Sequence, residues 1–144
     1  MAKLGQFGEM TAKFSSLADF VTVYISEAHP SEEANFTGNI DIAEHKVTSL
    51  CRTQNVSSLY RDHFQNFEER LEAAEILLGY KKAEDNYDIL VDLMDNKAGT
   101  AYAALPERLY VVLDGKIVYE GELGPFGYKL DEVEQYLVAR AKLN

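Results

Sequence analysis

Residues 108–120 read RLYVVLDGKIVYE, in which two runs of β-branched and aromatic residues are joined by Asp114-Gly115. An Asp-Gly pair between two such runs predicts a β-hairpin, because the tight turn needs positive φ at both central residues. An amphipathic helix is predicted after residue 130, with acids near its start and bases near its end, as the helix dipole favours. Its inward-facing side chains are expected to be Leu130, Val133, Tyr136 and Leu137.

Upstream of the hairpin, the apolar pattern predicts alternating helices and strands. Apolar spacings of three and four predict helices over residues 1–18 and 67–78, the second of which ends at Gly79. Apolar and β-branched runs predict a buried strand at 20–25 and a second strand at 88–93. This order matches an α/β class: a thioredoxin-like domain with a mixed sheet and flanking helices, lacking its first strand.

Composition narrows the class of protein. The 144 residues include 14 Lys and Arg against 24 Asp and Glu, a net charge of −10, and 47% are hydrophobic. Polyphosphate would be repelled, so no nucleic-acid partner is expected, and the chain suffices for a single domain over 1–144. No apolar run reaches the roughly 18 to 20 residues that cross a bilayer, so the chain as written is expected to be soluble. One cysteine and three histidines without metal-type spacing predict neither an internal disulfide nor a metal site.

The first predicted helix begins without a visible cap. Ser, Thr, Asp or Asn normally precede the first turn, and none stands before Ala2, so the helix is expected to begin upstream of Met1. A thioredoxin-like fold keeps its reactive group between the first strand and the first helix, which here is just before Met1. Without that central strand, two sheet edges and much apolar surface should be exposed, so a chain of this length is expected to be poorly stable.

Several ordered blocks of the sequence resemble the iodothyronine deiodinases, thioredoxin-fold selenoenzymes that remove iodine from thyroid hormones. The family's active-site segment reads approximately Ser-Cys-Thr-Sec-Pro-Pro-Phe-Met, and residues 1–7 (MAKLGQF) resemble its continuation from that methionine. Residues 102–110 are most similar to the outer-ring, or type 1, branch. The remaining similar blocks are 18–31, 41–45, 69–74, 92–96 and 124–128.

The resemblance implies reductive deiodination by a selenolate nucleophile that lies upstream of Met1. In this reaction the selenolate attacks ring iodine, a proton goes to the ring carbon, and a thiol reductant acts as co-substrate, with no bound cofactor. The resemblance also implies a homodimer held in the endoplasmic reticulum or plasma membrane by an amino-terminal helix. The 144 residues alone are expected to be inactive. A UGA codon read as a stop would account for the start at Met1, and a natural short isoform is the alternative.

The resemblance assigns roles to four residues. His29, on the loop after the first strand, is expected to bind the hormone and to deliver a proton, since an imidazole titrates near neutral pH. Glu27 could orient His29 or share its proton. His45, the family's second histidine, and Arg108, whose planar guanidinium can clamp a carboxylate, are expected to bind substrate. Pro106 lies near the place where thioredoxin-like folds keep a cis proline.

Residues 47–65 interrupt the resemblance. Removing them restores the family's spacing between His45 and Arg70. The codons at both edges of the block are compatible with splice junctions, so a retained intron is one interpretation and a lineage-specific loop is the other. Cys51 and His63 fall inside the block and receive no role in either case.

Two other functions fit the same residues. The first is a non-catalytic thioredoxin-like module that binds hormone or a protein partner and retains Glu27, His29, His45 and Arg108. The second is a related thioredoxin-fold peroxidase or reductase with its reactive residue upstream.

Overall fold

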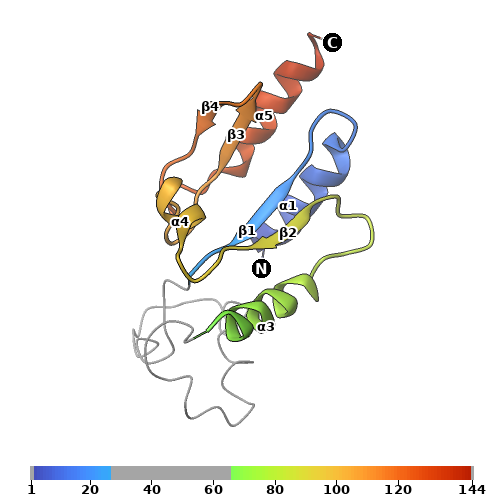
Figure 1. The fold of residues 1–144 in the computed structure, drawn as a ribbon. Helices are drawn as coiled ribbons and strands as arrows, with labels where there is room; N and C mark the ends of the chain where they lie inside the picture. The colour runs from blue at the N-terminus through green and yellow to red at the C-terminus, as the bar shows by residue number, and fades with distance from the viewer. Residues whose placement is uncertain (1, 27–65, 144) are drawn as a thin grey trace.

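The computed structural model describes residues 2–26 and 66–143, and the predicted order of helices and strands is confirmed for this part of the chain (Figure 1). The short helix α4 is an element that the sequence pattern did not predict. The elements are α1 (Ala2–Phe14), β1 (Val21–Tyr24), α3 (Phe67–Leu78), β2 (Asp88–Val91), α4 (Lys97–Ala101), β3 (Tyr110–Leu113), β4 (Lys116–Glu120) and α5 (Leu130–Ala141).

The four described strands form two sheets of two strands each. β1 pairs in parallel with β2, and β3 pairs antiparallel with β4. The mixed α/β architecture with flanking helices is therefore confirmed. The sequence predicts one mixed sheet that contains both pairs. In the described ranges the two pairs are separate sheets, because no strand of one pair is hydrogen-bonded to a strand of the other.

The hairpin forms as the sequence predicts. Asp114 has φ 50° and Gly115 has φ 72°, the positive values that a tight turn between antiparallel strands requires. Farther from the turn the ladder becomes irregular between Val111 and Val112. Val112 faces Ile117 but Val111 faces Tyr119, so Val118 is an extra residue in β4. Such a β-bulge shifts every later pairing by one residue.

The core lies between α1, α5 and the segment that leads into β2. Phe7 of α1 packs edge-on against Tyr87, with ring centroids 5.0 Å apart. Lys13 Nζ also lies 2.6 Å from Glu134 Oε1 and joins α1 to α5 on the surface. Burial of each large apolar side chain contributes about 1.5–3 kcal/mol. The buried cluster contains Phe7, Met10, Phe14, Tyr87, Leu130, Val133 and Leu137, with Tyr136 partly buried against it.

The prediction that residues 20–25 form a buried strand is wrong for the outward face of β1. Val21 is 52% exposed and Val23 is 40% exposed, and Leu90 of the paired strand β2 is 55% exposed. Because side chains alternate along a strand, this face of the two-stranded sheet is uncovered by the described residues.

Arg70 of α3 is buried and organises the turn after β2. Its Nη1 donates to the carbonyl oxygens of Asp92 and Leu93 at 2.9 Å and 2.8 Å, and its Nη2 donates to Asn96 Oδ1 at 2.8 Å. The start of α3 is fixed separately by Asn66, whose side chain accepts from the backbone N–H of Glu69 at 3.0 Å. Helix α3 therefore holds the segment that connects β2 to α4.

No helix in the described ranges is both long enough and apolar enough to cross a bilayer.

Candidate site at the open end of the β3–β4 hairpin

Arg108 lies at the open end of the hairpin, two residues before β3 begins at Tyr110. Arg108 and Tyr110 are two positions apart, so a strand projects both side chains to the same face. Tyr110 pairs with Glu120 across the ladder, which brings the carboxylate of Glu120 to this end. The Nη2 of Arg108 lies 2.6 Å from Glu120 Oε1, and its Nε donates to the carbonyl oxygen of Gly121, also at 2.6 Å.

An aromatic pair lies beneath the guanidinium group. The Arg108 Cζ is 5.4 Å from the centroid of the Tyr110 ring, and the Tyr110 and Tyr102 rings are 5.0 Å apart. The Tyr110 hydroxyl donates to the carbonyl oxygen of Tyr102. Burial is the main cause that raises the pKa of Tyr110; Arg108 lowers it and Glu120 raises it. Tyr110 is therefore a neutral support for the arginine at physiological pH.

The two charged groups differ in their contact with water. The side chain of Arg108 is 18% exposed and that of Glu120 is 52% exposed. A partly desolvated guanidinium binds an anion more strongly than one in water, because the local dielectric is lower. Within the described residues, Arg108 Nη1 has no hydrogen-bond partner. This arrangement can accept a carboxylate from a ligand.

Two proline loops flank the arginine. The Leu105–Pro106 and Gly124–Pro125 peptide bonds are both cis, and Pro106 is the proline that lies near the place where thioredoxin-like folds keep a cis proline. The loops are joined by a hydrogen bond from the Gly124 N–H to the Glu107 carbonyl oxygen at 2.9 Å.

Lys3 of α1 anchors the second of these loops. Its Nζ donates to the carbonyl oxygens of Pro125 at 2.8 Å and Tyr128 at 3.1 Å, and it lies 5.2 Å from the centroid of the Tyr128 ring. Burial, with a smaller contribution from Glu107, raises the pKa of Tyr128 to about 12. Phe126, at the tip of the anchored loop, is 95% exposed. Sequence reasoning missed this contact because Lys3 and the loop lie at opposite ends of the chain.

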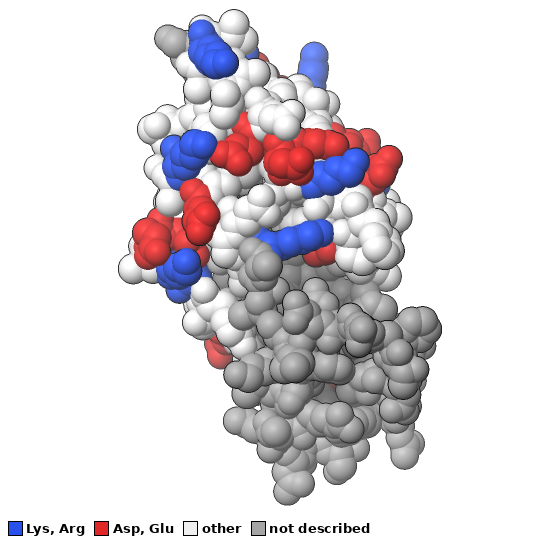
Figure 2. Space-filling model, turned by 180° about the vertical axis from the view of Figure 1, so that it is seen from behind, with Lys and Arg blue, Asp and Glu red and all other residues white. Residues whose placement is uncertain are grey.

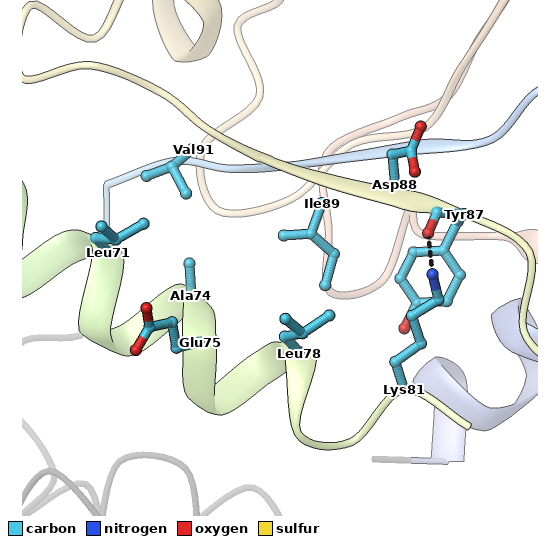
Figure 3. A pocket seen from close by; sticks show the side chains of 9 residues that line it. All are labelled: Leu71, Ala74, Glu75, Leu78, Lys81, Tyr87, Asp88, Ile89 and Val91. Atoms are coloured by element: carbon cyan, nitrogen blue, oxygen red, sulfur yellow. Dashed lines mark hydrogen bonds between the residues drawn. The ribbon is translucent and has the colours of Figure 1, made fainter. Parts of the chain in front are cut away.

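A cavity of about 200 Å³ lies between α3 and β2 (Figure 3). The residues that line it do not include Arg108 or the residues that contact Arg108. Lys81 Nζ donates to the main-chain oxygen of Tyr87 at its edge, and the buried Tyr87 hydroxyl has no partner among residues 2–26 and 66–143. The volume is below the roughly 300–1,000 Å³ of pockets that enclose larger ligands. The cavity is lined by Leu71, Ala74, Glu75, Leu78, Lys81, Tyr87, Asp88, Ile89 and Val91.

Arg108 is the predicted site residue that the structure describes. Glu27, His29 and His45 lie outside the described residues, as do Cys51 and His63. The roles assigned to the first three therefore stay predictions. Glu120 was not predicted, because a regular two-residue hairpin would place Tyr119 opposite Tyr110, and the bulge at Val118 puts Glu120 there instead.

Metal binding is not indicated in the described part. There, no three His, Cys, Asp or Glu side chains lie close enough together to hold a metal ion. The histidines and the cysteine of the chain lie elsewhere, so the absence of a metal site stays a prediction.

The described surface carries charges of both signs. Figure 2 shows acidic and basic side chains close together on the face turned away from the viewer of Figure 1. Among the described residues, Lys129 Nζ and Glu132 Oε1 form an ion pair at 3.2 Å. Such a surface has no broad basic field of the kind that binds nucleic acid on the face drawn. The expectation that nucleic acid is not a partner rests on this and on the acidic composition.

The sequence of the chain matches a known class of protein domain. Residues 1–141 match the family model of the iodothyronine deiodinases, and the chain belongs to this family. It is 35% identical over 131 residues to type I iodothyronine deiodinase of Xenopus laevis, which covers 91% of the chain and 43% of that protein.

Relatives with two other names match to a similar degree. Identity is 33% over 138 residues with thyroxine 5-deiodinase of Sparus aurata, covering 95% of the chain and 43% of the relative. It is 33% over 135 residues with type II iodothyronine deiodinase of Petromyzon marinus, covering 94% and 40%. The chain thus spans about two fifths of the length of these relatives. The resemblance of residues 102–110 to the type 1 branch stays a prediction.

Proposed function

We propose that the protein containing this chain deiodinates thyroid hormones reductively, and that Arg108 binds the carboxylate of the iodothyronine. Membership of the iodothyronine deiodinase family over residues 1–141 carries the proposal. The geometry adds a specific support: a partly buried guanidinium, oriented by Gly121 and Glu120, with donor capacity left for a ligand.

The remaining parts of the reaction are proposed from the family resemblance. A selenocysteine upstream of Met1 supplies the nucleophile, because a soft selenolate suits attack on polarizable iodine. A thiol reductant restores the enzyme. His29 binds substrate and delivers the proton to the ring carbon, Glu27 orients His29, and His45 binds substrate. The full-length protein is proposed to be a membrane-anchored homodimer.

We further propose a thioredoxin-like arrangement with one more strand between β1 and β3. In the described residues each of these strands pairs on one side alone, β1 with β2 and β3 with β4. A strand that bonds to both free edges would unite the two pairs into the mixed sheet that the sequence predicts.

The test is iodide release from labelled iodothyronine by the full-length protein with a thiol present. Arg108→Gln should weaken hormone binding about ten- to a hundredfold, the range that loss of a charge-assisted hydrogen bond produces. Lys116→Gln, which removes an exposed cation of the same hairpin, is the matched control and should leave binding unchanged. Failure to release iodide would overturn the proposed reaction, and unchanged binding by Arg108→Gln would overturn the role of Arg108.

A non-catalytic hormone-binding module is the second candidate, because the contacts that orient Arg108 among the described residues come from the β3–β4 hairpin and the residue after it. Hormone binding without iodide release would favour it. Peroxide turnover without iodide release would favour the peroxidase or reductase alternative.

A further inference from the structure

We propose that Lys3 is a positioning residue for deiodination: it fixes the start of α1 against the proline loop 124–128 and thereby aligns the nucleophile with the hormone bound at Arg108. The inference rests on the proposed function, in which a nucleophile upstream of Met1 attacks a hormone held by Arg108. It goes further by naming the contact that sets the relative position of these two parts of the site.

Lys3 stands on the packed face of α1, at the end nearest the start of the helix. Residues 3, 7, 10 and 14 follow helical spacing, so Lys3 shares a face with Phe7, Met10 and Phe14. These three side chains are buried in the core and fix the helix from Phe7 onward. Lys3 itself is exposed, and it restrains the first turn by a polar contact instead.

The ammonium group of Lys3 bridges two carbonyl groups of the loop. Its Nζ donates to the oxygens of Pro125 at 2.8 Å and Tyr128 at 3.1 Å. It also lies 5.2 Å from the centroid of the Tyr128 ring, which packs against the core. The contact thus ties the first turn of α1 to a fixed point of a segment 122 residues away in sequence.

The same loop is bonded to the residues on both sides of Arg108. The Gly124 N–H donates to the carbonyl oxygen of Glu107 at 2.9 Å, and the Gly121 N–H donates to that of Leu109 at 2.8 Å. The carbonyl oxygen of Gly121 accepts from Arg108 Nε at 2.6 Å. Hydrogen bonds and consecutive residues therefore connect Lys3 to Arg108.

The described contacts that orient Arg108 do not include Lys3. They come from Glu120, Gly121 and Tyr110. Loss of Lys3 should therefore leave the affinity for hormone unchanged and slow the reaction of the bound hormone. Alignment of the reacting atoms contributes to the rate of the chemical step, whereas ground-state binding does not depend on it.

The experiment uses the full-length protein with a thiol present. It measures the rate of iodide release at saturating labelled iodothyronine, and the dissociation constant of the hormone by equilibrium dialysis. Lys3→Met removes the donors and keeps an apolar stem, and Lys3→Arg keeps a cation that can donate to carbonyl groups. Lys13→Met is the matched control, because Lys13 joins the other end of α1 to Glu134 of α5 by an ion pair at 2.6 Å. Thermal midpoints within about 4 °C of the wild type establish that the variants are folded.

In Lys3→Met the rate of iodide release should fall about three- to fivefold, as expected for an exposed charge-assisted contact, with an unchanged dissociation constant. Lys3→Arg and Lys13→Met should match the wild type. An unchanged rate in Lys3→Met, an equal loss in Lys13→Met, or a loss of affinity in place of rate would overturn the role of Lys3. A wild-type protein that releases no iodide would instead overturn the proposed function, and this inference with it.

A second measurement separates position from charge. The pH dependence of alkylation by iodoacetamide reports the pKa of the nucleophile, and it should be the same in Lys3→Met and the wild type. A raised pKa in Lys3→Met would show that the lysine acts by its charge and would overturn positioning.

Gly127→Ala displaces the loop while the lysine stays in place. The added Cβ would lie 2.6 Å from the carbonyl oxygen of Leu123, so the loop must shift. This variant should also release iodide more slowly at an unchanged alkylation profile. A wild-type rate of iodide release in Gly127→Ala would show that the position of the loop does not matter for the reaction.

Discussion

Arg70 and Asp92 are both buried, yet they hold one turn from two sides instead of forming a direct ion pair. The guanidinium of Arg70 donates to the carbonyl oxygen of Asp92 at 2.9 Å. The Asp92 carboxylate turns the other way and accepts from the backbone N–H groups of Ala98 at 3.1 Å and Gly99 at 2.8 Å. A cation thus satisfies carbonyl groups at the end of β2, and an anion satisfies amide groups at the start of α4.

Arg70→Met should lower the free energy of unfolding by about 3 kcal/mol, because it leaves buried carbonyl groups without donors. Urea denaturation of the full chain measures this loss. Lys82→Met, at an exposed position after α3, is the control and should change the value by less than about 0.5 kcal/mol. A loss below about 1 kcal/mol in Arg70→Met would contradict the role assigned to the buried guanidinium.

Asp92→Asn should cost about 1–3 kcal/mol, since a single amide oxygen replaces the two carboxylate oxygens that accept from Ala98 and Gly99. The local readout is hydrogen exchange, which should become faster at these two amides and stay the same in the β3–β4 hairpin. Unchanged exchange at Ala98 and Gly99 would show that the carboxylate does not hold this turn.

Tyr119 should make stability sensitive to alkaline pH. Burial, and next the hydrogen bond that its hydroxyl donates to Glu132 at 2.9 Å, raise the pKa of Tyr119 to about 12. An unfolded tyrosine has a pKa of about 10. The raised value means that the contribution of Tyr119 is complete below pH about 10 and is lost as the pH rises through about 12. In Tyr119→Phe the fall in unfolding free energy across this window should be smaller.

The measurement for Tyr119 is urea denaturation at several pH values between neutral and strongly alkaline. Tyr80→Phe is the control and should follow the wild-type curve. Coincident pH profiles for Tyr119→Phe and the wild type would rule out the assigned contribution.

Lys3→Gln should loosen the loop that carries Phe126. The lysine makes two hydrogen bonds to that loop from an exposed position, so its loss should cost at most about 1 kcal/mol. This corresponds to about fivefold faster chymotrypsin cleavage after Phe126, if opening of the loop limits the rate. Lys116→Gln is the control. Equal cleavage rates in all three proteins would show that Lys3 does not restrain the loop.

The sequence predicted the elements whose signals are local. Asp114-Gly115 specifies the turn by its own φ preferences, and helix α5 follows from apolar spacing within a few turns. Helix α4 was missed because it has five residues and begins after a polar stretch, where neither periodicity nor a clear cap is present. Its position depends on Arg70, which is 22 residues away from Asp92 in sequence. No local pattern contains such a contact.

The candidate site, like the fold, could be predicted from the sequence only in part. Arg108 was found by resemblance and by its place before a strand, whereas its ion-pair partner required the three-dimensional register. Turn geometry alone places Tyr119 opposite Tyr110, and a bulge leaves almost no signature in a run of β-branched residues. The exposure of Val21 depends on which elements pack against that face of the sheet. This is a property of the assembled fold and not of residues 20–25 alone.

The bulge makes β4 one residue longer than its partner strand β3. Val118 has no partner in the ladder, so a chain that lacked this one residue would still join Tyr119 to Val111 and Glu120 to Tyr110. What would change is curvature, because a bulge bends the strand that contains it and increases its twist. Loss of a residue at this point would therefore straighten the hairpin while the same residues stay paired at its open end. The number of residues in β4 can thus change without changing which residues meet beside Arg108.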